Sequence, residues 1–306
     1  MLDLIIIGAG PAGLAASIYA SRFNLKHIVI GETPGGTINW AHQVDNYPGL
    51  PGLTGLELGK RFLDHAEKQG GQIINDNVFE LSRQGQGFTV NTSKKSYQTK
   101  ALVIATGTER RKLNIPGEKE LVGKGVSYCP TCDAPFYKDK TVVIVGGADA
   151  ACSGAIHLAH FAKKVYLIYR KSSLRAEPFW VKEIKQNPKI ETIYGRNLVK
   201  ILADDNGRVA AVELDKPYSD SRQIDCQGVF IEIGGTPLTS LAAKIGVKLE
   251  TDGHIKTNNN METNVRNVFC VGDINSTFKE FKQVISAAAE GAIAAQGVYQ
   301  NLNRGK

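Results

Sequence analysis

A chain of 306 residues, with 42% hydrophobic and 22% charged side chains, is long enough for about two domains and apolar enough to exclude a disordered protein. No stretch approaches the ~20 consecutive apolar residues of a membrane span, and the N-terminal segment lacks the marks of a signal peptide, so we expect a cytoplasmic protein. The net charge of +7 suits anionic partners or merely a soluble basic surface, and its Lys and Arg residues form no nucleic-acid-binding stripe.

The chain opens with the pattern of a nucleotide-binding unit. Residues 3–8 predict a short buried strand, a glycine-rich turn (GAGPAG) covers 8–13, and a helical pattern then leads to an apolar strand at 27–31. Glycines allow a tight turn and close backbone approach, and the start of the helix offers unpaired N–H groups to a pyrophosphate. The pattern indicates a dinucleotide site, with an α/β crossover that binds no ligand as the alternative.

A cysteine pair lies in the middle of the chain. Cys129 and Cys132 can close a disulfide with little backbone strain, and neighbouring N–H groups can stabilise one thiolate. A zinc site would need two further ligands at a compatible spacing, which the remaining cysteines and histidines do not supply, so redox chemistry is favoured over a purely structural pair. The carboxylate of Asp133 could serve a thiol as general acid and base, or cap the next turn. The other cysteines are predicted to be small core residues: Cys152, Cys226 and Cys270.

The nucleotide-binding pattern then recurs. An apolar strand ends at Gly146, 138 residues after Gly8, and a glycine turn, a helix and a second strand ending at Arg170 follow in the same order. Two such units in register are far less probable by chance than one. The second strand of the first unit ends in Glu32, whose carboxylate suits a ribose with free hydroxyls, and hence FAD. Arg170 lies at the same spacing, and with Lys171 and Arg175 it suits the 2′-phosphate of NADPH, or forms only a solvated turn.

Segments from both ends of the chain complete the predicted first domain. Residues 101–107 predict a strand ending in small residues that suit a flavin, and 268–273 predict another with Asp273 at its carboxyl end. Residues 282–299 have helical spacing. The fold prediction is therefore α/β with two Rossmann-like domains, the second inserted into the first, divided as 1–112 with 240–306, and 113–239.

Several short motifs follow one another along nearly the whole chain in a specific order and spacing. They are GAGPAG at 8–13, Gly35-Gly36, VDNYPG at 44–49, ATG at 105–107, C-x-x-C-D at 129–133, R-K-x-x-x-R at 170–175, VGD at 271–273 and KQV at 282–284. Together they resemble the low-molecular-weight thioredoxin reductase family.

This resemblance implies a homodimer that passes electrons from NADPH through FAD and the Cys129–Cys132 disulfide to thioredoxin or a similar small protein. It matches Asp133 to the family's proton donor, beside the catalytic cysteines. The flavin-site residues predicted from the motifs and the resemblance are Gly8, Ala9, Gly10, Pro11, Ala12, Gly13, Gly31, Glu32, Gly36, Thr37, Asn46, Val78, Ala105, Thr106, Gly107, Gly272, Asp273, Lys282, Gln283 and Val284. The residues predicted for NADPH are Gly146, Gly147, Ala148, Asp149, Ala150, Arg170, Lys171 and Arg175.

The chain departs from the family pattern at several positions. Ala148 replaces a usual glycine, Ser153-Gly154 replaces an acidic pair, and Lys171 replaces a common second Arg. On the flavin side Thr37 replaces a Gln, and the usual ribose acid falls at Gly31. NADH or ferredoxin therefore stays an alternative donor, a peroxiredoxin or glutaredoxin-like protein an alternative acceptor, and a flavin redox sensor an alternative function.

Overall fold

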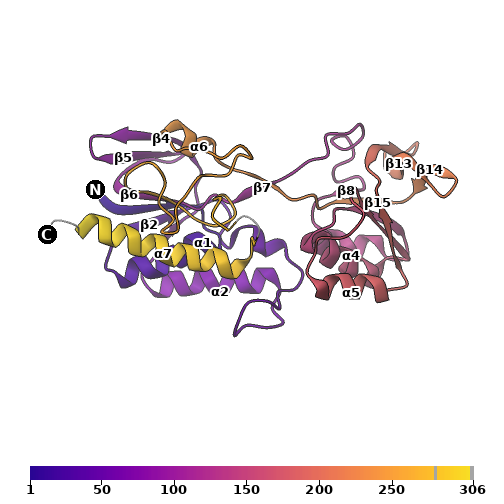
Figure 1. Cartoon of the computed structure of the whole chain (residues 1–306), viewed down its shortest axis with the longest axis horizontal. Coiled ribbons are helices and arrows are strands. Elements are labelled where there is room, and N and C mark those ends of the chain that lie inside the picture. The colour runs from indigo at the N-terminus through magenta and orange to yellow at the C-terminus, as the bar shows by residue number, and fades with distance from the viewer. Residues whose placement is uncertain (279–280, 304–306) are drawn as a thin grey trace. The chain divides into compact units, whose positions relative to one another are not determined.

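The computed structural model describes residues 1–278 and 281–303. The chain divides into two compact units, which are seen in Figure 1. Unit 1 contains Met1–Glu109 and Thr236–Lys306, and unit 2 contains Arg110–Gly235. The predicted α/β fold, with a second Rossmann-like unit inserted into the first, is confirmed.

Unit 1 is built on a seven-stranded sheet. Its strands are β1 (Leu2–Ile7), β2 (His27–Ile30), β3 (Gln72–Ile74), β4 (Val78–Gln84), β5 (Gly87–Thr92), β6 (Ser96–Ile104) and β17 (Val268–Cys270). The sheet runs in the order β3-β2-β1-β6-β5-β4, and β17 pairs with β6 beside this path. β3, β2, β1, β6 and β17 pair in parallel, whereas β4, β5 and the start of β6 pair antiparallel. The parallel strands are nearly continuous apolar runs, as expected where both faces of a sheet are covered.

The helices of unit 1 are α1 (Pro11–Arg22), η1 (Gly36–Trp40), α2 (Gly55–Lys68), α6 (Ser240–Lys244) and α7 (Val284–Asn303). α7 lies along α1 in Figure 1. The two backbones approach so closely that a Cβ on Gly291 would lie 2.1 Å from the carbonyl oxygen of Ala12. This contact brings the last helix of the chain against the first one, beside the first glycine turn.

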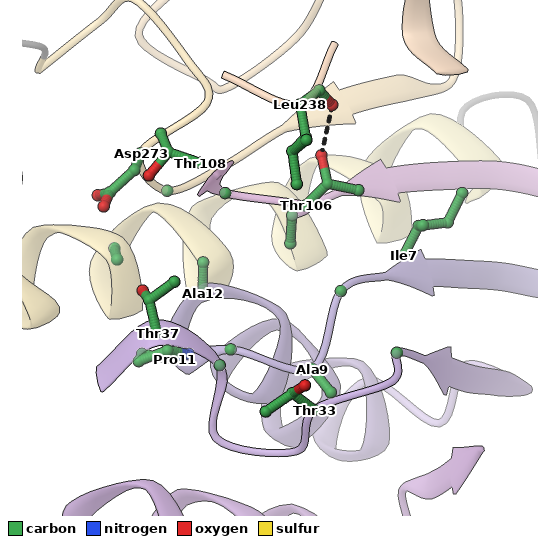
Figure 2. A pocket seen from close by; sticks show the side chains of 18 of the residues that line it. Ile7, Ala9, Pro11, Ala12, Thr33, Thr37, Thr106, Thr108, Leu238 and Asp273 are labelled. Carbon is green, nitrogen blue, oxygen red and sulfur yellow. Dashed lines mark hydrogen bonds between the residues drawn. The ribbon is translucent and has the colours of Figure 1, made fainter. Parts of the chain in front are cut away.

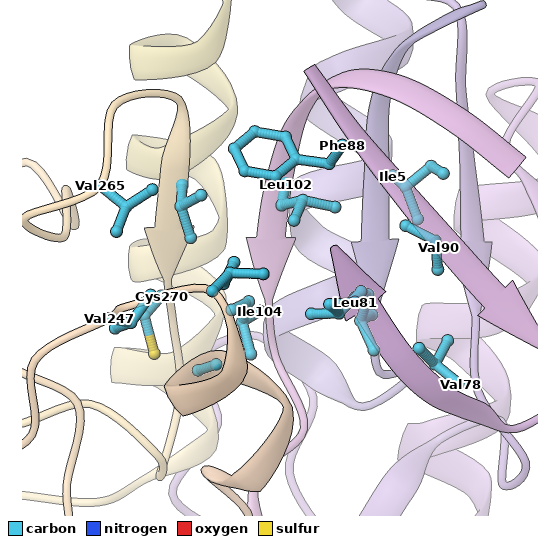
Figure 3. Close-up of a cluster of buried hydrophobic side chains, with 14 of the residues drawn as sticks. Ile5, Val78, Leu81, Phe88, Val90, Leu102, Ile104, Val247, Val265 and Cys270 are labelled. Carbon is cyan, nitrogen blue, oxygen red and sulfur yellow. The ribbon is translucent and has the colours of Figure 1, made fainter. Parts of the chain in front are cut away.

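One apolar core fills a face of the unit 1 sheet, and Figure 3 shows part of it. Phe88 and Val90 of β5 pack with Leu102 and Ile104 of β6. Cys270 of β17 is fully buried in the same cluster, which confirms that it is a core residue. Side chains of the antiparallel strands therefore share one core with those of the parallel strands.

Unit 2 contains a five-stranded parallel sheet. Its strands are β8 (Val126–Ser127), β9 (Thr141–Val145), β10 (Lys164–Tyr169), β11 (Ile190–Tyr194) and β15 (Gly228–Ile231), in the order β11-β10-β9-β15-β8. The helices of this unit are α3 (Pro130–Asp133), η2 (Ala134–Tyr137), α4 (Asp149–Phe161) and α5 (Pro178–Gln186). Within residues 1–278 and 281–303, no helix is long and apolar enough to span a bilayer.

Two smaller sheets complete the chain. An antiparallel sheet in unit 2 joins β12 (Leu198–Ala203), β13 (Val209–Tyr218) and β14 (Ser221–Asp225). The chain passes between the units along β7 (Thr108–Arg110) and β16 (Gly235–Pro237), which pair with each other. Both crossings are therefore made by one two-stranded ribbon.

Candidate active site

The first glycine turn is shaped by close backbone contacts between β1 and α1. Gly8 has φ +113°, and a Cβ there would lie 2.2 Å from the carbonyl oxygen of Ala105, so only glycine fits. Gly10 is the N-cap of α1 and Pro11 follows it at the start of the helix. Because glycine has no side chain that could occupy the N–H groups of the first turn, these groups are left for a ligand.

A cavity of about 490 Å³ opens at this turn, and all the residues that line it belong to unit 1. Its size is in the range of small-molecule sites, roughly 300–1,000 Å³. Figure 2 shows it between the turn around Ala9 and Pro11 and the segments that carry Thr106 and Leu238. The predicted flavin-site residues in its lining are Gly8, Ala9, Gly10, Pro11, Ala12, Gly31, Glu32, Gly36, Thr37, Val78, Ala105, Thr106, Gly107, Gly272, Asp273, Lys282, Gln283 and Val284.

The two other predicted flavin-site residues contact members of this lining. A Cβ on Gly13 would lie 1.9 Å from the carbonyl oxygen of Gly8, so Gly13 lets α1 pack closely against the turn. Asn46 donates a hydrogen bond from Nδ2 to Oε1 of Gln283, at 3.1 Å. Both residues therefore contact the lining of the pocket without belonging to it.

Several lining residues were not predicted from the sequence. Leu238 reaches the pocket because its carbonyl oxygen accepts a hydrogen bond from Oγ1 of Thr106, at 2.9 Å. Asp76 and Asn77 follow β3, and the rule that ligands bind at the carboxyl ends of parallel strands would have found them. Hydrogen bonds led by the Ser93 hydroxyl lower the pKa of Asp76 to about 2. The full set is Ile7, Ile30, Thr33, Ile38, Trp40, Asp76, Asn77, Thr108, Leu238, Leu241 and Ala287.

Two residues of opposite charge, Asp273 and Lys282, line the wall of the pocket that follows β17. Burial raises the pKa of Asp273, against the influence of Lys282. Burial lowers the pKa of Lys282, and nearby carboxylates including Glu290 and Asp273 oppose this shift. The structure thus places an acid and a base, both withdrawn from water, beside the cavity.

The predicted cysteine pair in unit 2 is joined. Cys129 and Cys132 form a disulfide with a Cα–Cα distance of 5.3 Å. The backbone N–H of Cys132 points at Sγ of Cys129, at 3.2 Å, so it can stabilise a thiolate there after reduction. Cys132 is exposed, and Asp133 is half-buried at the end of α3. The pair is therefore open to a partner and has a carboxyl group next to it in the chain.

The remaining cysteines differ from this pair. Cys152, Cys226 and Cys270 are free and buried, which confirms the prediction that they are core residues. Burial raises the pKa of Cys152 and of Cys226 to about 12, and raises that of Cys270 well above its ordinary value. Since the thiolate is the reactive form, these raised pKa values disfavour thiol chemistry at the three buried cysteines.

The second glycine turn repeats the geometry of the first. Gly146 has φ +148°, and a Cβ there would lie 2.2 Å from the carbonyl oxygen of Glu232. Ala148 is the N-cap of α4 with an extended backbone (φ −104°, ψ −176°), which any residue can adopt. Asp149 and Ala150 begin the helix. A methyl group, rather than backbone strain, is thus what Ala148 adds at this helix end.

The predicted basic residues lie at the same edge of the unit 2 sheet. Arg170 and Lys171 follow β10 directly, and both are exposed. The backbone N–H of Arg175 donates to the carbonyl oxygen of Gly147, at 2.8 Å, which ties this segment to the glycine turn. Ser153 on α4 donates its hydroxyl to the carbonyl oxygen of Asp149, at 2.8 Å. This edge of the sheet therefore carries cationic side chains. Where the family usually has an acidic pair, it has Ser153, whose hydroxyl is already hydrogen-bonded.

Comparisons with known proteins agree with this geometry. The family described as pyridine nucleotide-disulphide oxidoreductase matches residues 2–291. The thioredoxin reductase of Bacillus subtilis (strain 168) is 39% identical over 298 residues, which cover 97% of this chain and 93% of that protein. The crystal structure of Lactococcus lactis thioredoxin reductase in its FR conformation has a TM-score of 0.94 at 30% identity, with 99% and 100% of the two chains covered. The crystal structure of a ferredoxin-flavin thioredoxin reductase from Clostridium acetobutylicum is 33% identical with a TM-score of 0.54. The match covers 99% of this chain and 98% of that chain.

Proposed function

We propose, from the premise that this chain belongs to the pyridine nucleotide-disulphide oxidoreductase family, that it is a flavin-dependent thioredoxin reductase. Membership of this family implies a flavin and a nicotinamide nucleotide. The proposal specifies FAD and NADPH, a small disulfide protein such as thioredoxin as acceptor, and a cytoplasmic homodimer. The observation that carries it is the Cys129–Cys132 disulfide, which lies in a chain with two glycine turns of the same build.

The pocket of unit 1 fits FAD. The close backbone approach at Gly8 and the free first turn of α1 suit the pyrophosphate, and Glu32 at the pocket's edge suits the ribose hydroxyls. Glu32 is an exposed residue, as expected for a group at the mouth of the cavity. The predicted flavin domain, residues 1–112 and 240–306, would then also include Leu238, which lines the pocket, and the predicted NADPH domain, residues 113–239, would lack it.

The turn around Gly146 in unit 2 suits the pyrophosphate of NADPH. Arg170, Lys171 and Arg175 lie exposed beside it, where their charges can contact the 2′-phosphate. A planar guanidinium binds a phosphate through two hydrogen bonds, so the two Arg residues would give most of the selectivity over NADH.

The Cys129–Cys132 disulfide would pass electrons from the flavin to the acceptor protein as thiols. A bound flavin would supply the two-electron chemistry that links a nicotinamide donor to the disulfide. Two electrons and two protons open the Cys129–Cys132 bond, and one thiolate attacks the acceptor's disulfide to form a mixed disulfide. The second cysteine resolves it, which restores the Cys129–Cys132 bond and releases the reduced acceptor. Asp133 would deliver and remove the proton at the cysteine Sγ.

The donor is tested by anaerobic titration of the purified yellow protein, followed by flavin absorbance. NADPH is expected to bleach the flavin, and oxidised thioredoxin is expected to restore its colour. Ferredoxin is the rival donor, because Ala148 and Ser153 depart from the family pattern at the nucleotide edge. Bleaching by reduced ferredoxin, with the flavin left oxidised by both NADPH and NADH, would reject the nicotinamide donor.

The disulfide mechanism predicts a clean separation of two steps. Cys132→Ser should abolish thioredoxin reduction but spare flavin reduction by NADPH, because only the acceptor step needs the cysteine pair. Cys152→Ala is the matched control, since Cys152 is buried and free, and it should retain turnover with thioredoxin. Sustained turnover of the Cys132→Ser protein would refute the mechanism.

A further inference from the structure

A buried carboxylate lies in α7, just behind the pocket. Glu290 has only 1% of its surface exposed, in a helix segment that otherwise consists mostly of small apolar residues. Its Oε2 accepts hydrogen bonds from the backbone N–H of Gly272 and from Nδ2 of Asn275. Both donors belong to the turn that follows β17, so one carboxylate oxygen holds this turn at two points.

Lys282 binds the same turn through the opposite kind of group. Its Nζ donates to the carbonyl oxygen of Asn275 at 2.7 Å and to that of Gly272 at 3.3 Å. The N–H side of the turn is thus held by a carboxylate and the C=O side by an ammonium group. Asp273 lies between the two anchored residues, and Figure 2 shows it beside the pocket.

Burying the charges of Glu290 and Lys282 costs free energy, which an apolar residue at position 290 would avoid. An apolar residue in α7 would leave no buried charge to compensate, as at the neighbouring buried positions Ala287 and Ala294. Burial raises the pKa of Glu290, while its hydrogen bonds and Lys282 favour the charged form. The charges of Glu290 and Lys282 instead hold one turn in place through hydrogen bonds. Two residues of that turn, Gly272 and Asp273, line the pocket.

We propose that Glu290 and Lys282 are positioning residues, which fix the Gly272–Asp273 turn for the flavin and whose opposite charges set the flavin's midpoint potential. The inference rests on the proposed flavin site. Two-electron reduction adds negative charge to a flavin, so a nearby carboxylate opposes reduction and a nearby ammonium group favours it. The two residues would therefore act on the potential in opposite directions while acting on the turn in the same way.

The test compares Glu290→Gln and Lys282→Gln in the flavin-loaded protein at pH 8.5. Glu290→Gln should make flavin reduction about tenfold more favourable, which is about 30 mV more positive for a two-electron couple. Lys282→Gln should shift the potential by a similar amount in the negative direction. Both variants should release FAD about tenfold more readily, because each loses a charged contact to the turn.

Three further variants separate this role from simple stabilisation of the fold. Glu290→Asp keeps the charge and should keep the potential near that of the unchanged protein. The double variant should also return to that value, and Glu250→Gln, outside the pocket lining, should change neither quantity. Shifts of the same sign in the two single variants, or lowered thermal stability with unchanged potential and FAD affinity, would overturn the proposal. If Glu290→Gln does not fold, the sign of the Lys282→Gln shift decides. A chain that binds no flavin at all would instead reject the proposed function.

Discussion

Asp133 is the residue whose chemistry the sequence leaves most open, because a carboxylate after Cys132 can serve a thiol or cap a turn. In the structure it ends α3, and its backbone N–H donates to the carbonyl oxygen of Cys129, at 3.1 Å. The backbone of this short helix therefore holds Asp133 next to the disulfide whatever its side chain does. As the N-cap of η2, Asp133 makes no capping hydrogen bond with its side chain, so the capping role is not seen and a role in proton transfer is favoured.

We expect Asp133→Asn to slow thioredoxin reduction by about 100-fold or more, the usual range for loss of a general acid. The amide keeps the shape but cannot release or accept the proton of a cysteine. The measurement is the pH dependence of kcat with thioredoxin. Asp139→Asn is the matched control, an exposed residue six positions further along, and equal rates for the two variants would remove Asp133 from the mechanism.

Glu232 predicts a pH dependence of stability. Burial raises its pKa to about 7, although Arg110 forms an ion pair with it at 2.9 Å. In the unfolded chain the group ionises near its ordinary value of 4.5. As pH rises from 4.5 to 7, the Glu232 carboxyl ionises in the unfolded chain but stays mostly protonated in the folded protein. The free energy of unfolding should therefore fall over this window, by about 3 kcal/mol.

Denaturant unfolding at pH 5 and pH 8 measures this effect. Glu232→Gln should flatten the pH dependence, whereas Glu120→Gln, an exposed carboxylate in the same unit, should leave it unchanged. A slope that is the same with and without the Glu232 carboxyl would show that other groups cause it.

At the scale of single elements, α1 and α4 both begin at a glycine turn but differ in their N-caps. The N-cap of α1 is Gly10 and that of α4 is Ala148, both with an extended backbone. A glycine N-cap leaves room for a phosphate beside the first turn, and the alanine methyl group takes up part of that room. The two helix ends should therefore differ in how closely a pyrophosphate can approach.

Ala148→Gly should lower the KM for NADPH several-fold with little change in kcat, because it removes a steric contact and not a catalytic group. The thermal midpoint should change little, since glycine is at least as good an N-cap as alanine. Steady-state kinetics with thioredoxin as acceptor provide the measurement. An unchanged KM would mean that the methyl group does not face the nucleotide.

Across the whole molecule, the parts that the sequence predicts are those fixed by local rules. β1 and β9 are apolar runs buried on both faces, and Gly8 and Gly146 are required by backbone contacts, so their patterns are visible in the sequence. The antiparallel hairpin was not predicted: β4 is buried only at Val78 and Leu81 and so shows no strict alternation, although β5 does alternate. Their place in the sheet depends on partners elsewhere in the chain.

In the pocket, too, the residues that depend on distant partners are the ones that the sequence does not predict. Many residues predicted near it follow parallel strands or belong to glycine turns, where the α/β rule applies, whereas Asn46, Gln283 and Val284 were predicted from the family resemblance. Leu238 escaped prediction because it reaches the pocket through a hydrogen bond from Thr106, a residue 132 positions away. Glu290 escaped it because no ligand-binding motif contains it, although a single charged residue in a helix of small apolar ones is a visible irregularity.

The ribbon of β7 and β16 makes the inserted unit a removable module. Where the chain leaves unit 1 and returns, the backbone N–H of Leu238 donates to the carbonyl oxygen of Gly107, at 3.1 Å, so the two open ends are already joined. Every residue that lines the pocket lies on the unit 1 side of that junction. Replacing Arg110–Gly235 by a short hairpin turn should therefore give a smaller protein that still takes up FAD and is yellow, but cannot reduce thioredoxin. Failure of the folded truncated protein to bind FAD would show that the pocket needs the insert, and success would make this junction a place to graft other domains.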